Sequence, residues 1–268
     1  KTVSKNGKWC VEFGAWDGQY LSNTRNLIES QDYAAVLIEG SKTKFKELEK
    51  NYAQNPKVIT LNQFVGFEKK DNLDEILTKT SIPIDFDLLS IDIDGNDYYV
   101  WKTMTKYQPR VVCIEFNPTI PTEVKFIQKA DNSVNQGSSL LSLVELGKEK
   151  GYELVAVLSV NAFFVRKKYF PLFEITDNRP EVLRTNLDFV TYLFSGYDGQ
   201  VFLRGLKKLP WHGIDFSESK TQVLPGFLRK YPCNYNYIEK ALAVLYLLLS
   251  NHRIFTKKLF YRFKDAMS

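Results

Sequence analysis

Residues 9–18 (WCVEFGAWDG) combine an apolar run, an acidic residue and two glycines four positions apart. The apolar run predicts a buried strand, and the glycines predict a tight turn that leads into a helix over residues 21–30. Gly14 and Gly18 would let the backbone approach a ligand closely, while Glu12 would place a carboxylate at the strand end. Any tight strand-to-helix turn could use such glycines, so this segment by itself leaves the ligand open.

A second strand end strengthens the interpretation as a ligand loop. Residues 33–39 form a short apolar run that ends at Glu39, and Ser41 then fits the N-cap of a helix. A carboxylate at the end of the second strand of a βαβ unit can accept hydrogen bonds from ribose hydroxyls. A solvated loop acid is the alternative, but two strand-end acids favour a ribose site. The glycine spacing differs from the G-x-G-x-x-G dinucleotide fingerprint.

Strand and helix signals alternate through the first two-thirds of the chain. Strands are predicted at 57–62, 86–92, 110–117, 152–159 and 162–166, and helices at 73–78 and 139–150. This alternation predicts an α/β domain, with a mostly parallel sheet and helices on both faces, over residues 1–168.

Acidic and amide side chains crowd the ends of two of these strands. Several carboxylates at one sheet edge are costly unless a cation or protons compensate their charge. Asp94 to Asp97 could instead be a turn and helix cap. Four of the side chains would form a hard-oxygen set suited to Mg²⁺, Ca²⁺ or Mn²⁺: Asp92, Asp94, Glu115 and Asn117.

Four segments, 11–18, 37–40, 89–98 and 114–118, together resemble FkbM-type S-adenosylmethionine (SAM)-dependent methyltransferases associated with bacterial surface-polysaccharide biosynthesis. The resemblance covers roughly residues 8–168. It implies a Rossmann-like class I methyltransferase fold whose last strand is antiparallel, with SAM as methyl donor. It also implies O-methylation of a sugar, a nucleotide-sugar or a surface glycan, a small-molecule or glycan acceptor, and a cytoplasmic enzyme.

Site residues follow from this resemblance, position by position. Asp92 would face the methionine ammonium or the reacting hydroxyl, and Asp92 or Asp94 is the expected catalytic base or metal ligand, since some sugar O-methyltransferases use Mg²⁺. Asn62 stands where many relatives have an acidic or small polar adenine contact. The expected cofactor-binding residues are Glu12, Gly14, Ala15, Asp17, Gly18, Glu39, Asn62 and Asp92.

Residues 169–268 differ in character and are predicted to form a helical and irregular appendage. Prolines and aromatic residues are frequent, and the aromatic side chains could stack on a sugar or pack the appendage. His212, beside Trp211, is a further catalytic candidate. Residues 238–250 are apolar almost all round, which predicts a buried helix.

Charge separates the two ends of the chain. Residues 201–268 carry a formal charge of about +8 and residues 1–200 about −3, which together give the +5 of the whole chain. The basic, aromatic-rich stretch 251–264 could contact an anionic membrane surface at the inner face, a phosphate-bearing acceptor or another copy, or form a solvated helix face. No nucleic-acid-binding motif accompanies it, so a nucleic-acid partner is not expected.

Composition limits the remaining possibilities. The sequence contains no run of about 18 apolar residues, so no membrane span is predicted. Because a strand is predicted almost at residue 1, we expect a preceding segment in the full-length protein. The three dispersed cysteines are expected to be small core residues in a reducing compartment: Cys10, Cys113 and Cys233.

Three hypotheses therefore remain. The leading one is a SAM-dependent O-methyltransferase. The others are an NAD-dependent protein of Rossmann-like fold, against which the glycine spacing argues, and a non-catalytic scaffold that keeps the same fold in surface-polysaccharide biosynthesis.

Overall fold

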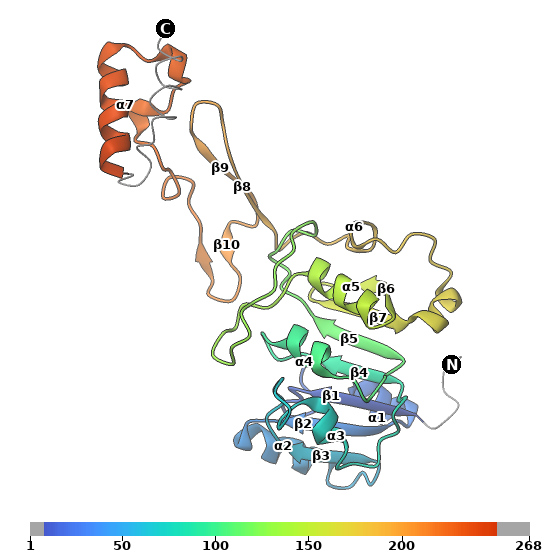
Figure 1. Cartoon of the computed structure of the whole chain (residues 1–268). Helices are drawn as coiled ribbons and strands as arrows, with labels where there is room; N and C mark the ends of the chain where they lie inside the picture. The colour runs from blue at the N-terminus through green and yellow to red at the C-terminus, as the bar shows by residue number, and fades with distance from the viewer. Residues whose placement is uncertain (1–7, 251–268) are drawn as a thin grey trace. The chain divides into compact units, whose positions relative to one another are not determined.

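The computed structural model describes residues 8–250 and divides the chain into two compact units, Lys1–Leu187 and Asp188–Ser268 (Figure 1). The sequence predicts the boundary between the α/β domain and the C-terminal appendage after residue 168. The division lies later because the 3-10 helix η1 (Lys167–Phe173) and the helix α6 (Pro180–Leu183) pack on the last strands of the first unit. The basic stretch 251–264 lies outside the described residues.

A seven-stranded sheet forms the first unit, in the order β3-β2-β1-β4-β5-β7-β6. β1 to β5 pair in parallel, and β7 runs antiparallel to both of its neighbours. This is the Rossmann-like class I methyltransferase fold, so the predicted fold class is confirmed. The strands are β1 (Trp9–Phe13), β2 (Ala34–Glu39), β3 (Val58–Asn62), β4 (Leu88–Ile91), β5 (Val111–Glu115), β6 (Tyr152–Val157) and β7 (Asn161–Arg166).

Helices cover both faces of this sheet. On one face lie α1 (Arg25–Gln31) and α2 (Lys42–Tyr52), and on the other α3 (Leu73–Leu77), α4 (Asp97–Thr103) and α5 (Leu140–Glu149). The predicted N-cap at Ser41 is present, since its side chain accepts a hydrogen bond from the Lys44 amide. The short helix α4 was not predicted, and α1 begins at Arg25 rather than at residue 21.

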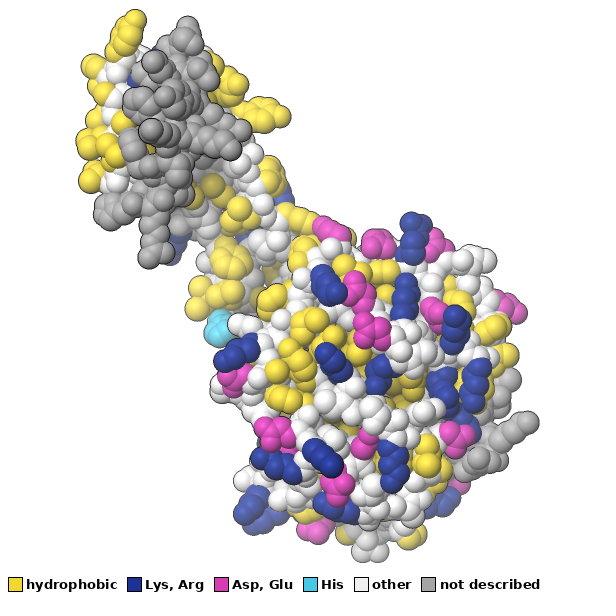
Figure 2. Space-filling model, viewed as in Figure 1, with side chains coloured by type: hydrophobic (Ala, Val, Ile, Leu, Met, Phe, Trp, Pro, Cys, Tyr) yellow, Lys and Arg dark blue, Asp and Glu magenta, His cyan; other side chains and the backbone are white. Residues whose placement is uncertain are grey.

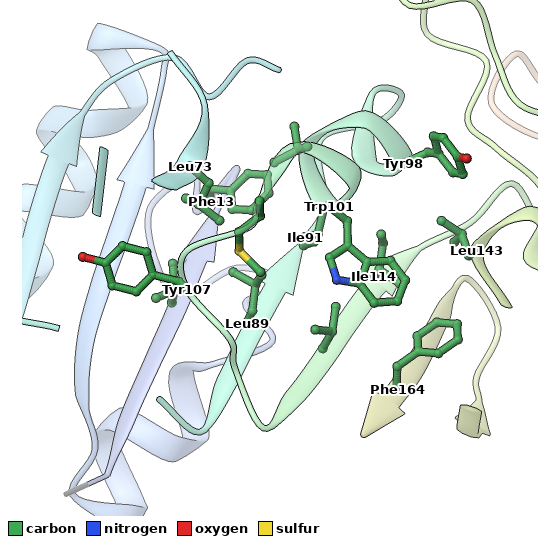
Figure 3. Close-up of a cluster of buried hydrophobic side chains, with 14 of the residues drawn as sticks. Phe13, Leu73, Leu89, Ile91, Tyr98, Trp101, Tyr107, Ile114, Leu143 and Phe164 are labelled. Carbon is green, nitrogen blue, oxygen red and sulfur yellow. The ribbon is translucent and has the colours of Figure 1, made fainter. Parts of the chain in front are cut away.

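Strand alternation divides the hydrophobic core between the two faces. Val11 and Phe13 of β1 point toward α3, α4 and α5, whereas Cys10 points toward α1 and α2. In the larger cluster the fully buried Trp101 packs edge-on against Tyr152, with ring centroids 5.7 Å apart (Figure 3). Because alternate residues of each strand are buried on opposite faces, the sheet is covered on both faces and its strand ends have fixed positions.

The second unit is built from small elements. Its strands pair as two hairpins, β8 (Thr191–Ser195) with β9 (Val201–Gly205) and β10 (Lys208–Leu209) with β11 (Ile214–Asp215). The 3-10 helices η2 (Gly226–Leu228) and η3 (Pro232–Asn234) then precede the helix α7 (Tyr237–Ser250). No helix within residues 8–250 has the length and apolar character that crossing a bilayer requires.

Two burial predictions were wrong. Among the α7 residues only Ala243 is buried, because the helix packs through one narrow face on the preceding segment. Cys233 is exposed, whereas Cys10 and Cys113 are buried strand residues as expected.

Candidate active site

Gly14 lies at the point where the strand order reverses. β1 pairs with β2 on one side and with β4 on the other, and the chain continues from β1 to α1 on one face of the sheet and from β4 to α4 on the other. Open α/β sheets bind their ligands at such a point. Gly14 has a φ of +72°, and a β-carbon at this position would lie 2.1 Å from the backbone oxygen of Asp92. Only glycine therefore allows the loops after β1 and β4 to meet as they do.

Glu12 holds the loop after β1 and is buried. Its carboxylate accepts hydrogen bonds from the Asn23 amide at 2.8 Å, the Ser22 hydroxyl at 2.6 Å and the Thr24 hydroxyl at 2.6 Å. These bonds keep residues 22–24 out of the helix that the sequence predicted, and α1 starts only at Arg25. Glu12, predicted as a cofactor contact, acts in this structure as a positioning residue for the loop.

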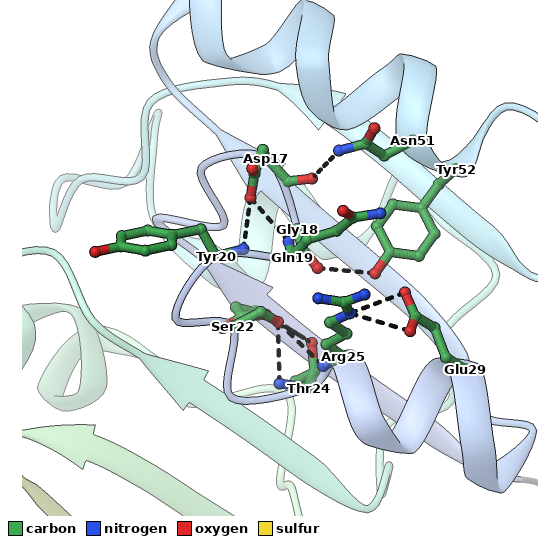
Figure 4. A network of polar contacts seen from close by, with 11 residues as sticks. Asp17, Gly18, Gln19, Tyr20, Ser22, Thr24, Arg25, Glu29, Asn51 and Tyr52 are labelled. Atoms are coloured by element: carbon green, nitrogen blue, oxygen red, sulfur yellow. Dashed lines mark hydrogen bonds and ion pairs between the residues drawn. The ribbon is translucent and has the colours of Figure 1, made fainter.

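The other loop residues predicted to bind the cofactor shape the backbone (Figure 4). Asp17 accepts hydrogen bonds through Oδ1 from the Gln19 amide at 2.9 Å and the Tyr20 amide at 2.8 Å. Gly18 has a φ of +73°, and a β-carbon there would lie 2.5 Å from the Tyr52 ring. The loop is thereby fixed against α2, and the side chains that it exposes include Trp16 and Tyr20.

Ala15 links this loop to the adjacent strand. The Ala15 amide donates a hydrogen bond to the backbone oxygen of Ile38 at 3.1 Å, and its own oxygen accepts from the Gly18 amide at 2.7 Å. Its side chain is buried. Ala15 thus contributes to the loop through its backbone.

Glu39 lies where β2 ends, as predicted. Its Oε2 accepts a hydrogen bond from the Trp16 amide at 2.8 Å and its Oε1 accepts from the Ser41 amide at 2.7 Å. An ionised carboxylate has about four acceptor positions, so this partly exposed group keeps capacity for ligand hydroxyls. Asn62, at the end of β3, donates to the Glu39 backbone oxygen at 2.8 Å.

Two exposed aromatic residues at this sheet edge were not singled out from the sequence. Trp16 is 45% exposed and lies under the Lys44 ammonium, which is 4.1 Å from its ring centroid. Phe64 follows β3 and is 55% exposed; a β-carbon added at Gly40 would lie 3.7 Å from its α-carbon. Their positions just after the ends of β1 and β3 are the sequence feature from which they could have been predicted.

A cluster of three carboxylates, Asp92, Asp94 and Glu115, follows β4 and ends β5. Each offers a ligand oxygen, and these oxygens all lie within 4.8 Å of one another. Burial raises the pKa of Asp92 to about 6, and the like charges of Asp97 and Asp94 add to the shift. Burial, and then the Asp92 charge, also raise the pKa of Glu115. Three clustered hard oxygen donors fit a divalent cation such as Mg²⁺.

Two neighbouring polar residues serve the backbone. Asp97 is buried and accepts hydrogen bonds from the Ile93 amide at 3.0 Å and the Gly95 amide at 2.9 Å, which closes the turn before α4. Asn117, predicted as a fourth metal ligand, accepts through Oδ1 from the amide and hydroxyl of Thr119. Its Nδ2 donates to the Gln136 oxygen at 2.7 Å. The carboxylate cluster accordingly consists of three side chains without Asn117.

His212 belongs to the second unit. It is exposed in the turn between β10 and β11. The site described above is formed by first-unit residues alone, and a catalytic role for His212 stays a prediction.

Comparisons with known proteins yield similarity of fold. No protein-family model and no curated protein sequence matches the chain. Among solved structures, the CMeT domain of the citrinin polyketide synthase is 10% identical, with 60% of this chain and 46% of that chain covered and a TM-score of 0.41.

Two further structures hold S-adenosyl compounds. The N-terminal domain of EvdMO1 with SAH bound is 10% identical, covers 60% of this chain and 73% of that chain, and has a TM-score of 0.38. M. jannaschii TYW2 in complex with AdoMet is 13% identical, covers 61% and 71%, and has a TM-score of 0.36. The chain covers less than half of the first of these three structures. We assign the fold class from the strand order of this chain itself.

Replacing Gly14 by alanine tests the close approach of the two loops. Gly14→Ala forces an L-residue into positive φ and its β-carbon against the Asp92 backbone oxygen, so we expect a loss of about 2 kcal/mol or more in the free energy of unfolding. Urea unfolding followed by circular dichroism measures it. The control is Gly226→Ala, where a β-carbon meets no atom within 4 Å. Equal stability of the two variants would contradict the assignment.

Replacing Glu115 by glutamine tests the repulsion in the carboxylate cluster. Raised folded-state pKa values mean that the folded chain holds more protons than the unfolded chain above about pH 4, so stability is lost as pH rises. Glu115→Gln removes a carboxyl group that must take up a proton, or stay charged beside Asp92, when the chain folds. At pH 8 it should raise the free energy of unfolding by at least about 1.4 kcal/mol, the equivalent of one pKa unit.

The gain should shrink at pH 5, where Asp92 and Glu115 of the wild-type chain hold most of their protons. Thermal unfolding at both pH values measures the difference. Glu49→Gln, at an exposed position of α2, is the control and should show no such pH dependence. A destabilised Glu115→Gln at pH 8 would contradict the electrostatic interpretation.

Proposed function

We propose that this protein is a SAM-dependent methyltransferase that methylates a hydroxyl of a sugar, a nucleotide-sugar or a surface glycan. One observation carries the proposal: the glycine loop after β1, the Glu39 carboxylate and a protonatable carboxylate cluster all lie at the carboxyl edge of one class I sheet. In open α/β sheets, ligands bind outside that edge at the switch point. The resemblance of the same segments to FkbM-type enzymes supports the sugar hydroxyl as acceptor.

The residues present fit the cofactor. Glu39 retains acceptor positions for ribose hydroxyls, and the Trp16 amide holds the turn at residues 14–18 beside it. The carboxylates at Asp92 and Asp94 provide a negative environment that suits the sulfonium and ammonium groups of SAM. When bound, SAM supplies an activated methyl group to an attacking hydroxyl.

Asp92 is the residue that best fits the base. Its raised pKa, about 6, lies near neutral pH, where a carboxylate can accept a proton from a hydroxyl and release it afterwards. Glu115 shares a hydrogen bond with Asp92 and orients it. Asp94 is exposed beside Asp92 and Glu115. Its carboxylate is the third oxygen donor that could bind Mg²⁺. A cation there would lower the pKa of the acceptor hydroxyl.

Calorimetric titration with S-adenosylhomocysteine tests cofactor binding. We expect wild-type protein to bind it and Glu39→Gln to bind at least about tenfold more weakly, because a charge-assisted acceptor for the ribose is lost. Glu49→Gln is the matched control and should bind like wild type. NAD⁺ should give no heat of binding. If wild-type protein bound NAD⁺ and not S-adenosylhomocysteine, the NAD-dependent alternative would replace this proposal.

Replacing Asp92 by asparagine separates binding from turnover. Asp92→Asn should still bind S-adenosylhomocysteine but lose methyl transfer by about 10²–10⁴-fold, the range typical of a lost general base. Transfer of labelled methyl from SAM to a panel of nucleoside diphosphate sugars is the assay, repeated with Mg²⁺ and with EDTA. Wild-type turnover in Asp92→Asn would refute the base role, and turnover insensitive to EDTA would exclude a required divalent cation. Cofactor binding by wild-type protein without transfer to any acceptor would favour the scaffold hypothesis.

A further inference from the structure

Helix α7 packs within the second unit through a side that carries Glu239, Ala243 and Tyr246. Glu239 forms an ion pair with Lys230 at 2.5 Å and accepts a hydrogen bond from the Asn236 amide at 3.0 Å. One and two turns further along, Ala243 is buried and the Tyr246 hydroxyl donates to the Val223 oxygen. This side of the helix therefore faces the segment 223–236.

The opposite side of α7 is apolar and exposed. Ile238, Leu242, Leu245 and Leu249 recur at intervals of four, three and four residues, which places them in one stripe along the helix. Ile238 is 73% exposed, Leu245 50% and Leu249 68%. Figure 2 shows hydrophobic side chains along the edge of the molecule that α7 forms. The remaining exposed members of this outward face are Tyr237, Ala241, Val244 and Leu248.

This outward face needs a cover that is apolar. A continuous apolar stripe in water is unfavourable, and exposed patches of this kind mark interaction surfaces. α7 has 14 residues and so extends about 21 Å, less than the roughly 30 Å hydrocarbon core of a bilayer. A lipid surface would accommodate it lying in the plane of the interface, with its outward face in the acyl region.

The charge of this part of the chain favours a lipid surface over a second copy of the chain as the partner of the outward face. Residues 251–268, which follow α7, contain five Lys and Arg residues and one acidic residue, interleaved with Phe, Leu and Ile. Residues 201–268 as a whole carry about +8. Two copies of such a unit would repel each other, whereas an anionic headgroup layer would attract it. An apolar face together with a polybasic segment supplies the two signals that stable membrane attachment requires.

We propose that the outward face of α7 docks onto an anionic lipid bilayer, to which the positive charge of residues 201–268 attracts it. Flotation with vesicles tests this on the full chain. Wild-type protein should float with vesicles of phosphatidylcholine and phosphatidylglycerol in equal parts. Binding to phosphatidylcholine alone should be at least about tenfold weaker, and about 1 M NaCl, where the Debye length is about 3 Å, should release most of the protein.

A double variant, Leu245→Glu with Leu249→Glu, should reduce flotation about a hundredfold or more, since two apolar side chains no longer enter the acyl region. Tyr197→Glu is the control: Tyr197 is 93% exposed but lies outside α7, so this variant should float like wild type. Circular dichroism confirms that each variant is folded. Leu245→Ala with Leu249→Ala, which keeps helix propensity, should give an intermediate loss.

Two results would overturn the proposal. One is wild-type protein that stays unbound with anionic vesicles. The other is a stable dimer in lipid-free solution, seen by sedimentation and abolished by the double glutamate variant, which would assign the outward face to a second copy of the chain.

Discussion

The close approach of Gly14 to the Asp92 backbone is the constraint on which the site depends. It brings the loops after β1 and β4 together at the point where the strand order reverses. With a β-carbon at position 14 these loops would separate, and the carboxylate cluster after β4 would move away from the glycine loop. The glycine loop and the carboxylate cluster can therefore lie together at one edge of the sheet only while this position remains glycine.

The same edge of the sheet stores unfavourable electrostatic energy. Asp92 and Glu115 are more than half buried, near two other acids, and retain protons that free carboxyl groups would lose. Other buried charges of the described residues have partners: Arg110 forms an ion pair with Asp87 at 2.7 Å, and the Glu12 carboxylate accepts three hydrogen bonds. A cluster of carboxylates that repel one another therefore marks a place shaped by a ligand or a reaction rather than by stability.

Periodicity and residue type predicted the seven strands of the first unit, the cap at Ser41 and the fold class, because these features depend on neighbours in sequence. The role of Glu12 could not be predicted, because the sequence around an acid at a strand end is the same whether the carboxylate contacts a ligand or its own loop. The three carboxylates of the cluster were anticipated, whereas the hydrogen bonds of Asn117 to Thr119 could not be, and its role as a metal ligand stays a prediction. Helix α4 was missed because its seven residues are too few to show a helical period.

The error over α7 concerns the cover of an apolar helix and not its existence. A helix that is apolar nearly all round must lose contact with water, but this requirement says nothing about whether protein or lipid replaces the water. In this chain Glu239 and Tyr246 of α7 have their partners within the unit, and most of the apolar side chains are exposed. The pattern that predicts burial in a core predicts burial in a bilayer equally well, and only the adjacent positive charge favours lipid.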